Sequence, residues 1–215
     1  MKLLRKELRL ATSPLTWFFL LAALLTMVPG YPILLGPYFV SFGIFQSYQT
    51  ARENQDILYS ALLPLPKRAV VTAKMQAAML FEGAGLLLMG ALTAVRVLLA
   101  QAPVYQSNAL MPANLTFLAF SLLIFAAFNG LFIRGFFKSA YRLGWPLIGF
   151  MIAAMLLVAA GEALWHFPGL EILGGTGAEG RLVRLGLLLG AAAVYALVTW
   201  ASLKSAQKRF ERIDL

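Results

Sequence analysis

The chain has 215 residues, of which 60% are hydrophobic and only 13% are charged, and its mean hydropathy is +0.78. A soluble domain of this composition could not bury its apolar surface, so a membrane protein is indicated. The net charge of +9 alone would suggest a nucleic-acid partner, but the placement of Lys and Arg accounts for it and no nucleic acid is expected. The absence of cysteine from the sequence excludes disulfides, thiolate metal sites and a cysteine nucleophile.

The basic residues form four clusters between long uncharged stretches. They are Lys2, Arg5, Lys6 and Arg9; Arg52, Lys67, Arg68 and Lys74; Arg134, Lys138 and Arg142; and Lys204, Lys208, Arg209 and Arg212. Short loops rich in Lys and Arg stay in the cytoplasm. This pattern predicts that both termini are cytoplasmic and that the chain crosses the membrane an even number of times.

The apolar stretches predict six transmembrane helices in a single transmembrane domain, 1–215. A helix needs about 20 mainly apolar residues to cross a bilayer core of about 30 Å. The stretches are continuously apolar, which favours helices over the alternating strands of a barrel. The fold class is an all-α polytopic membrane protein with spans at 15–34, 35–51, 69–100, 113–133, 144–164 and 182–203.

Residues 1–13 are expected to form an amphipathic interfacial helix. Leu4, Leu8 and Ala11 share one face, and Arg5, Lys6 and Arg9 lie opposite. The simpler alternative is a segment that only sets the topology. A cleaved signal is not expected, because the apolar run continues through Pro29, Gly30 and Pro32 without a clear cleavage site.

Residues 52–68 form a cytoplasmic segment with features of a docking helix. Glu53 and Asp56 suit the first turn of a short helix, whose positive dipole end favours acids, and Pro64 should end it. Ile57, Leu58 and Leu62 would give this helix an apolar face, lying flat on the cytoplasmic side. The alternative is a solvated loop.

Glu82 lies near the middle of the third span, where a carboxylate costs several kcal/mol unless it faces a cavity, takes a proton or finds a partner. Two interpretations stay open. In the first Glu82 acts in transport, so that Glu82→Gln would lower transport in a folded protein. In the second it makes a structural hydrogen bond to Gln46, Asn129 or a partner subunit.

No catalytic residue, metal site or cofactor site is expected in this chain. The glycines between Gly174 and Gly180 lack the Lys-Ser/Thr of a phosphate-binding loop. They lie in the predicted outer loop, 165–181, together with a short interfacial helix that would carry Trp165 and Phe167. His166, the single histidine of the sequence, is in the same loop without neighbouring metal ligands.

Two stretches carry a family resemblance: LLRKELRL ahead of the first span, and YSALLPLPKRAVVTAKM, which begins at Tyr59 after the acid-rich turn. They are similar to the membrane subunits of ABC exporters in the type-2 permease group, especially small stand-alone permeases such as the exporters of phenol-soluble modulin peptides. The pattern from Leu63 to Arg68 resembles the family's link between the second and third spans. Pro66 stands where the family often has Ser or Thr, which could stiffen the entry to the third span.

The resemblance implies a permease that dimerises, as a homo- or heterodimer, and pairs with separate ATPase subunits that bind ATP and magnesium. It implies an ATPase contact formed by Glu53, Asp56, Leu58, Tyr59 and Leu62, with Pro64 behind them. It also implies a translocation path along the dimer interface, for which the candidates are Trp17, Phe42, Phe45, Glu82 and Met151. Such aromatic and Met residues equally suit contacts with lipid or with other helices.

The expected cargo is an amphipathic peptide or another hydrophobic compound, because the spans have few side chains that would bind sugars. The expected location is the bacterial cytoplasmic membrane, surrounded by lipid. Two other functions stay open: an ion-coupled secondary transporter that uses Glu82, and a membrane scaffold that transports nothing.

Overall fold

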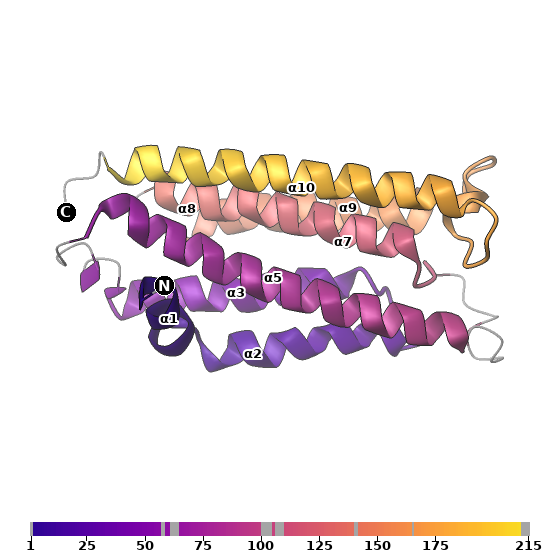
Figure 1. The fold of residues 1–215 in the computed structure, drawn as a ribbon, viewed down its shortest axis with the longest axis horizontal. Coiled ribbons are helices and arrows are strands. Elements are labelled where there is room, and N and C mark those ends of the chain that lie inside the picture. The colour runs from indigo at the N-terminus through magenta and orange to yellow at the C-terminus, as the bar shows by residue number, and fades with distance from the viewer. Residues whose placement is uncertain are drawn as a thin grey trace.

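The structure, a computed structural model, describes residues 2–56, 59–60, 65–99, 105, 110–139, 142–164 and 166–211. All regular elements within these ranges are helical. The long helices lie side by side along one common axis, and α1 crosses them near one end (Figure 1). The start of the described chain and the end of α10 lie at that same end.

The N-terminal region bends sharply before it enters the bundle. Helix α1 (Lys2–Lys6) continues as a π-helical turn (Glu7–Ala11), and α2 (Pro14–Leu20) continues as a 3₁₀ helix (Leu21–Met27). The two parts meet at 88°. Ser13 caps α2, since its hydroxyl accepts a hydrogen bond from the Leu15 amide at 3.3 Å, and Pro14 suits the first helical position.

The predicted first span, 15–34, is shorter in the structure. The helix ends at Met27, two residues before the Pro29-Gly30 pair, and Gly30 has a positive φ of 69° that suits the turn. The looser rise of the 3₁₀ stretch compensates in part, so α2 with its extension is about 25 Å long.

Helix α3 (Leu35–Glu53) is followed by α5 (Lys67–Leu98), the longest helix, with 32 residues. At about 48 Å, α5 exceeds the bilayer core. It is continuous and runs obliquely from the end of α10 at one end of the bundle to α2 at the other (Figure 1).

The second half of the chain forms the other side of the bundle. Helix α7 (Leu115–Ala127) passes through a π-helical segment (Phe128–Ile133) into α8 (Arg134–Lys138), followed by α9 (Gly144–Leu164) and α10 (Arg181–Phe210). Helices α7 and α10 pack along each other. An aromatic core fills the interior, with buried Phe45, Tyr48, Phe128, Phe132, Phe136, Phe137, Phe150 and Phe210.

The outer segment is a turn rather than the predicted interfacial helix. A short 3₁₀ helix (Glu171–Leu173) is the regular element there, and Trp165 lies outside the described residues. Asn114 caps α7 by accepting from the Thr116 and Phe117 amides, and it donates to the Leu173 carbonyl at 2.8 Å. The segment is thus held on the start of α7.

Within the part of the chain that the structure describes, four helices are long and apolar enough to cross a membrane: Lys67–Leu98, Leu115–Lys138, Gly144–Leu164 and Arg181–Phe210. A fifth is added if the bent pair Leu3–Ala11 and Pro14–Met27 counts as one span. Helix α3 is not among them, because its second half, from Gln46 onward, is rich in polar residues. An all-helical, multi-pass membrane protein is confirmed, whereas six crossings stay a prediction.

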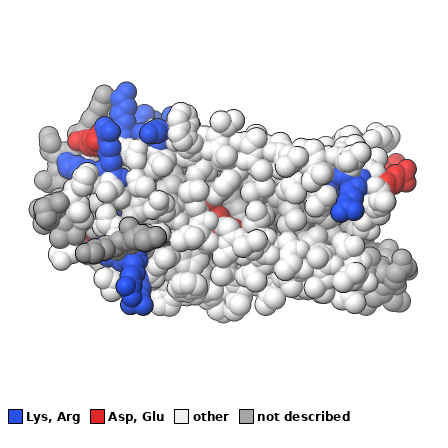
Figure 2. Space-filling view, viewed as in Figure 1, with Lys and Arg blue, Asp and Glu red and all other residues white. Residues whose placement is uncertain are grey.

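Lys and Arg side chains gather at one end of the bundle, and mostly uncharged surface separates them from a smaller group at the other end (Figure 2). We call these the basic end and the opposite end. The first contains the starts of α1 and α5 and the end of α10; the second contains Arg96, Arg181 and Arg184. This arrangement agrees with the predicted topology, in which the basic end is cytoplasmic.

Candidate functional site

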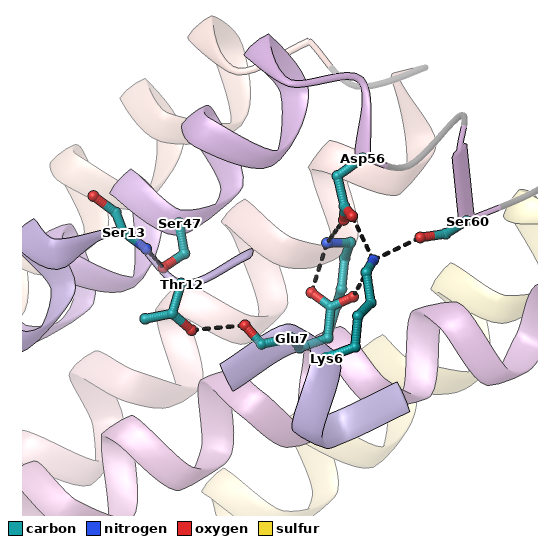
Figure 3. Close-up of polar contacts among 8 residues, drawn as sticks. Lys6, Glu7, Thr12, Ser13, Ser47, Asp56 and Ser60 are labelled. Carbon is teal, nitrogen blue, oxygen red and sulfur yellow. Dashed lines mark hydrogen bonds and ion pairs between the residues drawn. The ribbon is translucent and has the colours of Figure 1, made fainter. Parts of the chain in front are cut away.

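Two lysines and two carboxylates meet at the basic end, where α1, the segment after α3 and the first turns of α5 converge (Figure 3). The Lys74 ammonium lies 2.8 Å from Glu7 Oε2 and 2.9 Å from Asp56 Oδ2. Lys6 lies 3.2 Å from Glu7 Oε1 and also pairs with Asp56 Oδ1. We call Lys6, Glu7, Asp56 and Lys74 the four-charge cluster, in which each lysine contacts both carboxylates.

The cluster is largely shielded from solvent. Lys74 and Glu7 are each 4% exposed, and isolated charges at such sites would be very costly. Burial would raise the pKa of Asp56, but the Lys74 and Lys6 ammonium groups hold it below its usual value. Burial likewise opposes the charge on Lys6, yet Asp56 and Glu7 raise its pKa above the usual value. Asp56 and Lys6 are therefore charged at neutral pH.

Local backbone features bring these groups together. Gln55 has a left-handed φ of 51°, which ends α3 and turns the chain back toward the bundle. Lys6 also donates to the Ser60 hydroxyl at 2.7 Å. On the other side, the Ser13 amide donates to Ser47 Oγ at 3.2 Å, which ties the end of the N-terminal segment to α3.

A close crossing of α2 and α3 also holds the end of the N-terminal segment against α3. The Thr16 hydroxyl donates to the Gly43 carbonyl at 2.6 Å. A Cβ added at Gly43 would lie 2.5 Å from Phe19 Cβ, so only glycine lets α2 approach α3 this closely.

The residues expected to contact an ATPase differ in their placement. Glu53 is exposed at the end of α3 and accepts from Gln49 Nε2 at 2.9 Å. Tyr59 is 63% exposed. Asp56 instead points inward into the four-charge cluster. Leu58, Leu62 and Pro64 lie outside the described residues.

Glu82 is 1% exposed and connects three helical segments in the middle of the bundle. Its Oε2 accepts from Asn129 Nδ2 at 3.1 Å and from the Tyr195 hydroxyl at 2.6 Å. Asn129 Nδ2 also donates to Thr199 Oγ1 at 3.0 Å. Of the partners considered from sequence, Asn129 makes the contact and Gln46 does not. Within the described residues, Glu82 Oε1 and Asn129 Oδ1 have no hydrogen-bond partner.

The five path candidates do not surround one cavity among the described residues. Glu82 and Phe45 lie inside the bundle, Phe45 edge-on to Phe132. Phe42 is half-buried beside Phe45. Trp17 on α2 and Met151 on α9 face outward, with exposed fractions of 54% and 37%.

The sequence interpretation missed the roles of Lys6, Glu7 and Lys74. It used both lysines only as members of the basic clusters that predict the membrane topology, and it placed Lys6 on the solvent face of the N-terminal helix. One signal was available: Glu7 is an isolated acid within the basic stretch from Lys2 to Arg9.

Arg96 is a buried charge at the opposite end of the bundle. It is 5% exposed, donates to the Thr26 carbonyl and lies 4.8 Å from the centre of the Tyr105 ring. Its charge is satisfied within the bundle by a carbonyl and an aromatic face.

An apolar helical bundle, basic at one end, with charged segments packed onto that end, defines a multi-pass membrane protein of the permease class. The family described as ABC-2 family transporter protein matches residues 2–211. The chain belongs to this family and is the transmembrane component of an ABC transporter, which implies ATPase partner subunits. No curated protein and no solved structure matches the chain.

Proposed function

We propose that this chain is the membrane subunit of an ATP-driven exporter, working as a dimer with separate ATPase subunits docked at its basic end. The basic end is then cytoplasmic, and the membrane is the bacterial cytoplasmic membrane. The exporter moves amphipathic peptides or other hydrophobic compounds out of the cell. Family membership supports the ATPase partner, and the four-charge cluster supports the site of docking.

The four-charge cluster is the observation that carries this proposal. It connects the exposed Glu53 and Tyr59 region to the long helix α5 through the Asp56–Lys74 contact, and to α1 through the Asp56–Lys6 contact. A displacement of residues 53–60 by an ATPase would act on Lys74 and Lys6 together. Because α5 packs against both α2 and α10, movement of its first turns would reach both sides of the bundle.

The outward apolar faces of α2 and α9 support a dimer and an amphipathic cargo. Helix α3 lies between them: it packs on α2, and its Tyr38 ring stacks on Phe150 of α9 at 5.9 Å. Exposed large side chains on α2 and α9 include Leu15, Trp17, Phe18, Trp145, Ile148, Met151, Ile152, Met155 and Leu156. Flexible Met and aromatic surfaces suit varied apolar partners.

The test is purification of the tagged protein in mild detergent, followed by identification of bound proteins and an ATPase assay. We expect a near-stoichiometric ATPase subunit whose hydrolysis is stimulated by an amphipathic peptide. The variant in which Leu58 and Tyr59 are both changed to Ala should retain the complex's basal hydrolysis but lose peptide stimulation. Trp200→Ala, which removes an exposed aromatic side chain from α10, is the matched control and should keep the peptide stimulation.

Two outcomes would overturn parts of this proposal. A folded protein that copurifies with no ATPase would favour a secondary carrier or a scaffold. Full stimulation in the Leu58/Tyr59 variant would remove residues 53–60 from the coupling contact.

A further inference from the structure

A cavity of about 480 Å³ lies at the opposite end of the bundle, between α5, α7, the outer segment and the start of α10. On the α5 side it extends from Gly90 to Val97, about 10 Å along the helix. Small residues of α5 provide the space, and Val97, Leu115 and Leu118 make much of the wall apolar. The four-charge cluster and the Glu82 contacts are elsewhere in the bundle.

Among the described residues, the charged side chains that line this cavity are those of Arg181 and Arg184. Arg184 is 2% exposed, and its guanidinium donates to the Ile172 carbonyl at 2.7 Å and to the Gly177 carbonyl. Both acceptors are neutral. Within the described ranges no salt bridge includes either arginine. Glu171 and Glu179 line a neighbouring hollow with Arg184 but are not within ion-pair distance.

The charge balance here differs from that at the basic end. In the four-charge cluster, two ammonium groups face two carboxylates. In this cavity, a buried guanidinium and an exposed one face no carboxylate in the described structure. A buried charge is normally paired, so the cavity favours an anionic ligand.

Two further features supply hydrogen-bond donors. Helix α10 has 30 residues and begins after Gly180, whose φ is 68°. The Arg181 amide donates to the Ala178 carbonyl at 3.1 Å, and in the described structure no side-chain cap is present for the amides that follow it. Such a helix start binds anions. Thr93, which lines the cavity, is 6% exposed, and its hydroxyl has no hydrogen-bond partner among the described residues.

We propose that this cavity binds an anionic phospholipid from the adjacent leaflet. The phosphate lies at Arg181 and the start of α10, within the positive field of Arg184, and an acyl chain lies along the Val97 and Leu118 wall. The apolar wall favours a lipid over free phosphate. Arg181 is exposed at the membrane-facing end of α10, next to the outward Leu182, Val183 and Leu185. This site is independent of the exported cargo.

The experiment measures the unfolding temperature of the purified full-length protein in detergent during titration with lipid. We expect phosphatidylglycerol to raise this temperature, and phosphatidylcholine or inorganic phosphate at the same concentration to leave it unchanged. Arg181→Gln should raise the phosphatidylglycerol concentration for half the effect about tenfold, the effect of losing one charged hydrogen bond. Lys204→Gln removes an exposed charge from the other end of α10 and should behave as the wild type.

Ala94→Phe provides a second variant, because it fills the apolar part of the cavity without changing charge, and it should also weaken the phosphatidylglycerol effect. Equal effects of phosphatidylglycerol and phosphatidylcholine would overturn the proposal. A full rise in unfolding temperature with phosphate alone would also overturn it, because it would indicate a simple anion site. The same holds if Arg181→Gln and Lys204→Gln weaken the phosphatidylglycerol effect equally. An unaltered titration in Ala94→Phe would exclude the cavity as the lipid position.

Discussion

The ammonium group of Lys74 lies 2.8 Å from the carboxylate of Glu7, although the two residues are 67 positions apart in the chain. The same ammonium lies 2.9 Å from Asp56. One side chain of α5 therefore contacts both the N-terminal helix and the segment proposed to receive an ATPase. A single buried charge of the bundle thus contacts both peripheral segments.

Lys74→Met should destabilise the protein by about 3 kcal/mol, because it leaves Glu7 and Asp56 with only Lys6 as a cationic partner in the described structure. The measurement is the free energy of unfolding in denaturant, with Lys204→Met as the exposed control. The combined Glu7→Gln and Lys74→Met variant should cost less than the sum of the single changes. Simple additivity would show that the two side chains do not interact.

Asp56→Asn should be less stable than the wild type at neutral pH, and the difference should disappear in acid. The pKa of Asp56 is below its usual 3.8 in the folded protein. Its contribution is therefore present above about pH 4 and is lost as the pH falls through the folded pKa. Unfolding temperatures of both proteins between about pH 3 and pH 8 provide the test. A difference that grows in acid contradicts the ion contacts at Asp56.

Lys6→Gln should show the opposite dependence. The pKa of Lys6 is raised above its usual 10.5, so its contribution is complete below about pH 10 and is lost only as the pH rises through the folded pKa. From about pH 5 to pH 9 the stability difference from the wild type should be constant. A slope in this range, measured by thermal unfolding, would mean that Lys6 is not held by carboxylates.

Glu82→Gln and Glu82→Leu separate the two roles considered for this carboxylate. Gln keeps an acceptor for Asn129 and Tyr195, so we expect a folded protein with transport within about twofold of the wild type. Leu removes the acceptor of the Tyr195 hydroxyl and one of the two acceptors of Asn129 Nδ2, which keeps Thr199, and it should cost about 1–3 kcal/mol. If Glu82→Gln abolishes transport in a protein of normal stability, the carboxylate takes part in the transport step itself.

Gly43→Ala should destabilise the contact between α2 and α3 by about 1–3 kcal/mol, because the new methyl group overlaps Phe19 and separates Thr16 from the Gly43 carbonyl. Gly149→Ala on α9 is the control. A Cβ at Gly149 meets nothing within 4 Å in the described structure, so the change should be neutral or slightly stabilising. Thermal unfolding of the two variants compares them directly.

Helix positions could be predicted from the sequence because a bilayer forces the backbone to satisfy its own hydrogen bonds. The fifth predicted span, 144–164, coincides with α9, and the third starts two residues after α5 begins. The first span was predicted too long, because its last apolar residues, through Ile33 and Leu34, fold as a turn beyond Met27. Hydropathy does not distinguish such a buried turn from helix.

The polar contacts could be predicted from the sequence only in part. A carboxylate in mid-span needs a donor, so Asn129 was a reasonable candidate for Glu82, but the choice over Gln46 depends on how the helices rotate. Lys74 and Glu7 gave no such signal, because charges near a membrane surface are ordinarily solvated. Their pairing depends on the 88° bend after Ala11, which charge patterns do not predict.

The position of Lys74 also affects the order in which the protein matures. A chain is made from its N-terminus, so Glu7 is synthesised well before Lys74 and has only its neighbour Lys6 as a partner until α5 exists. The N-terminal helix, although it leaves the ribosome first, therefore reaches its final orientation only after the first two membrane helices and the start of α5 are in place. We expect the docking of that helix on Lys74 to be a late step in the folding of the chain.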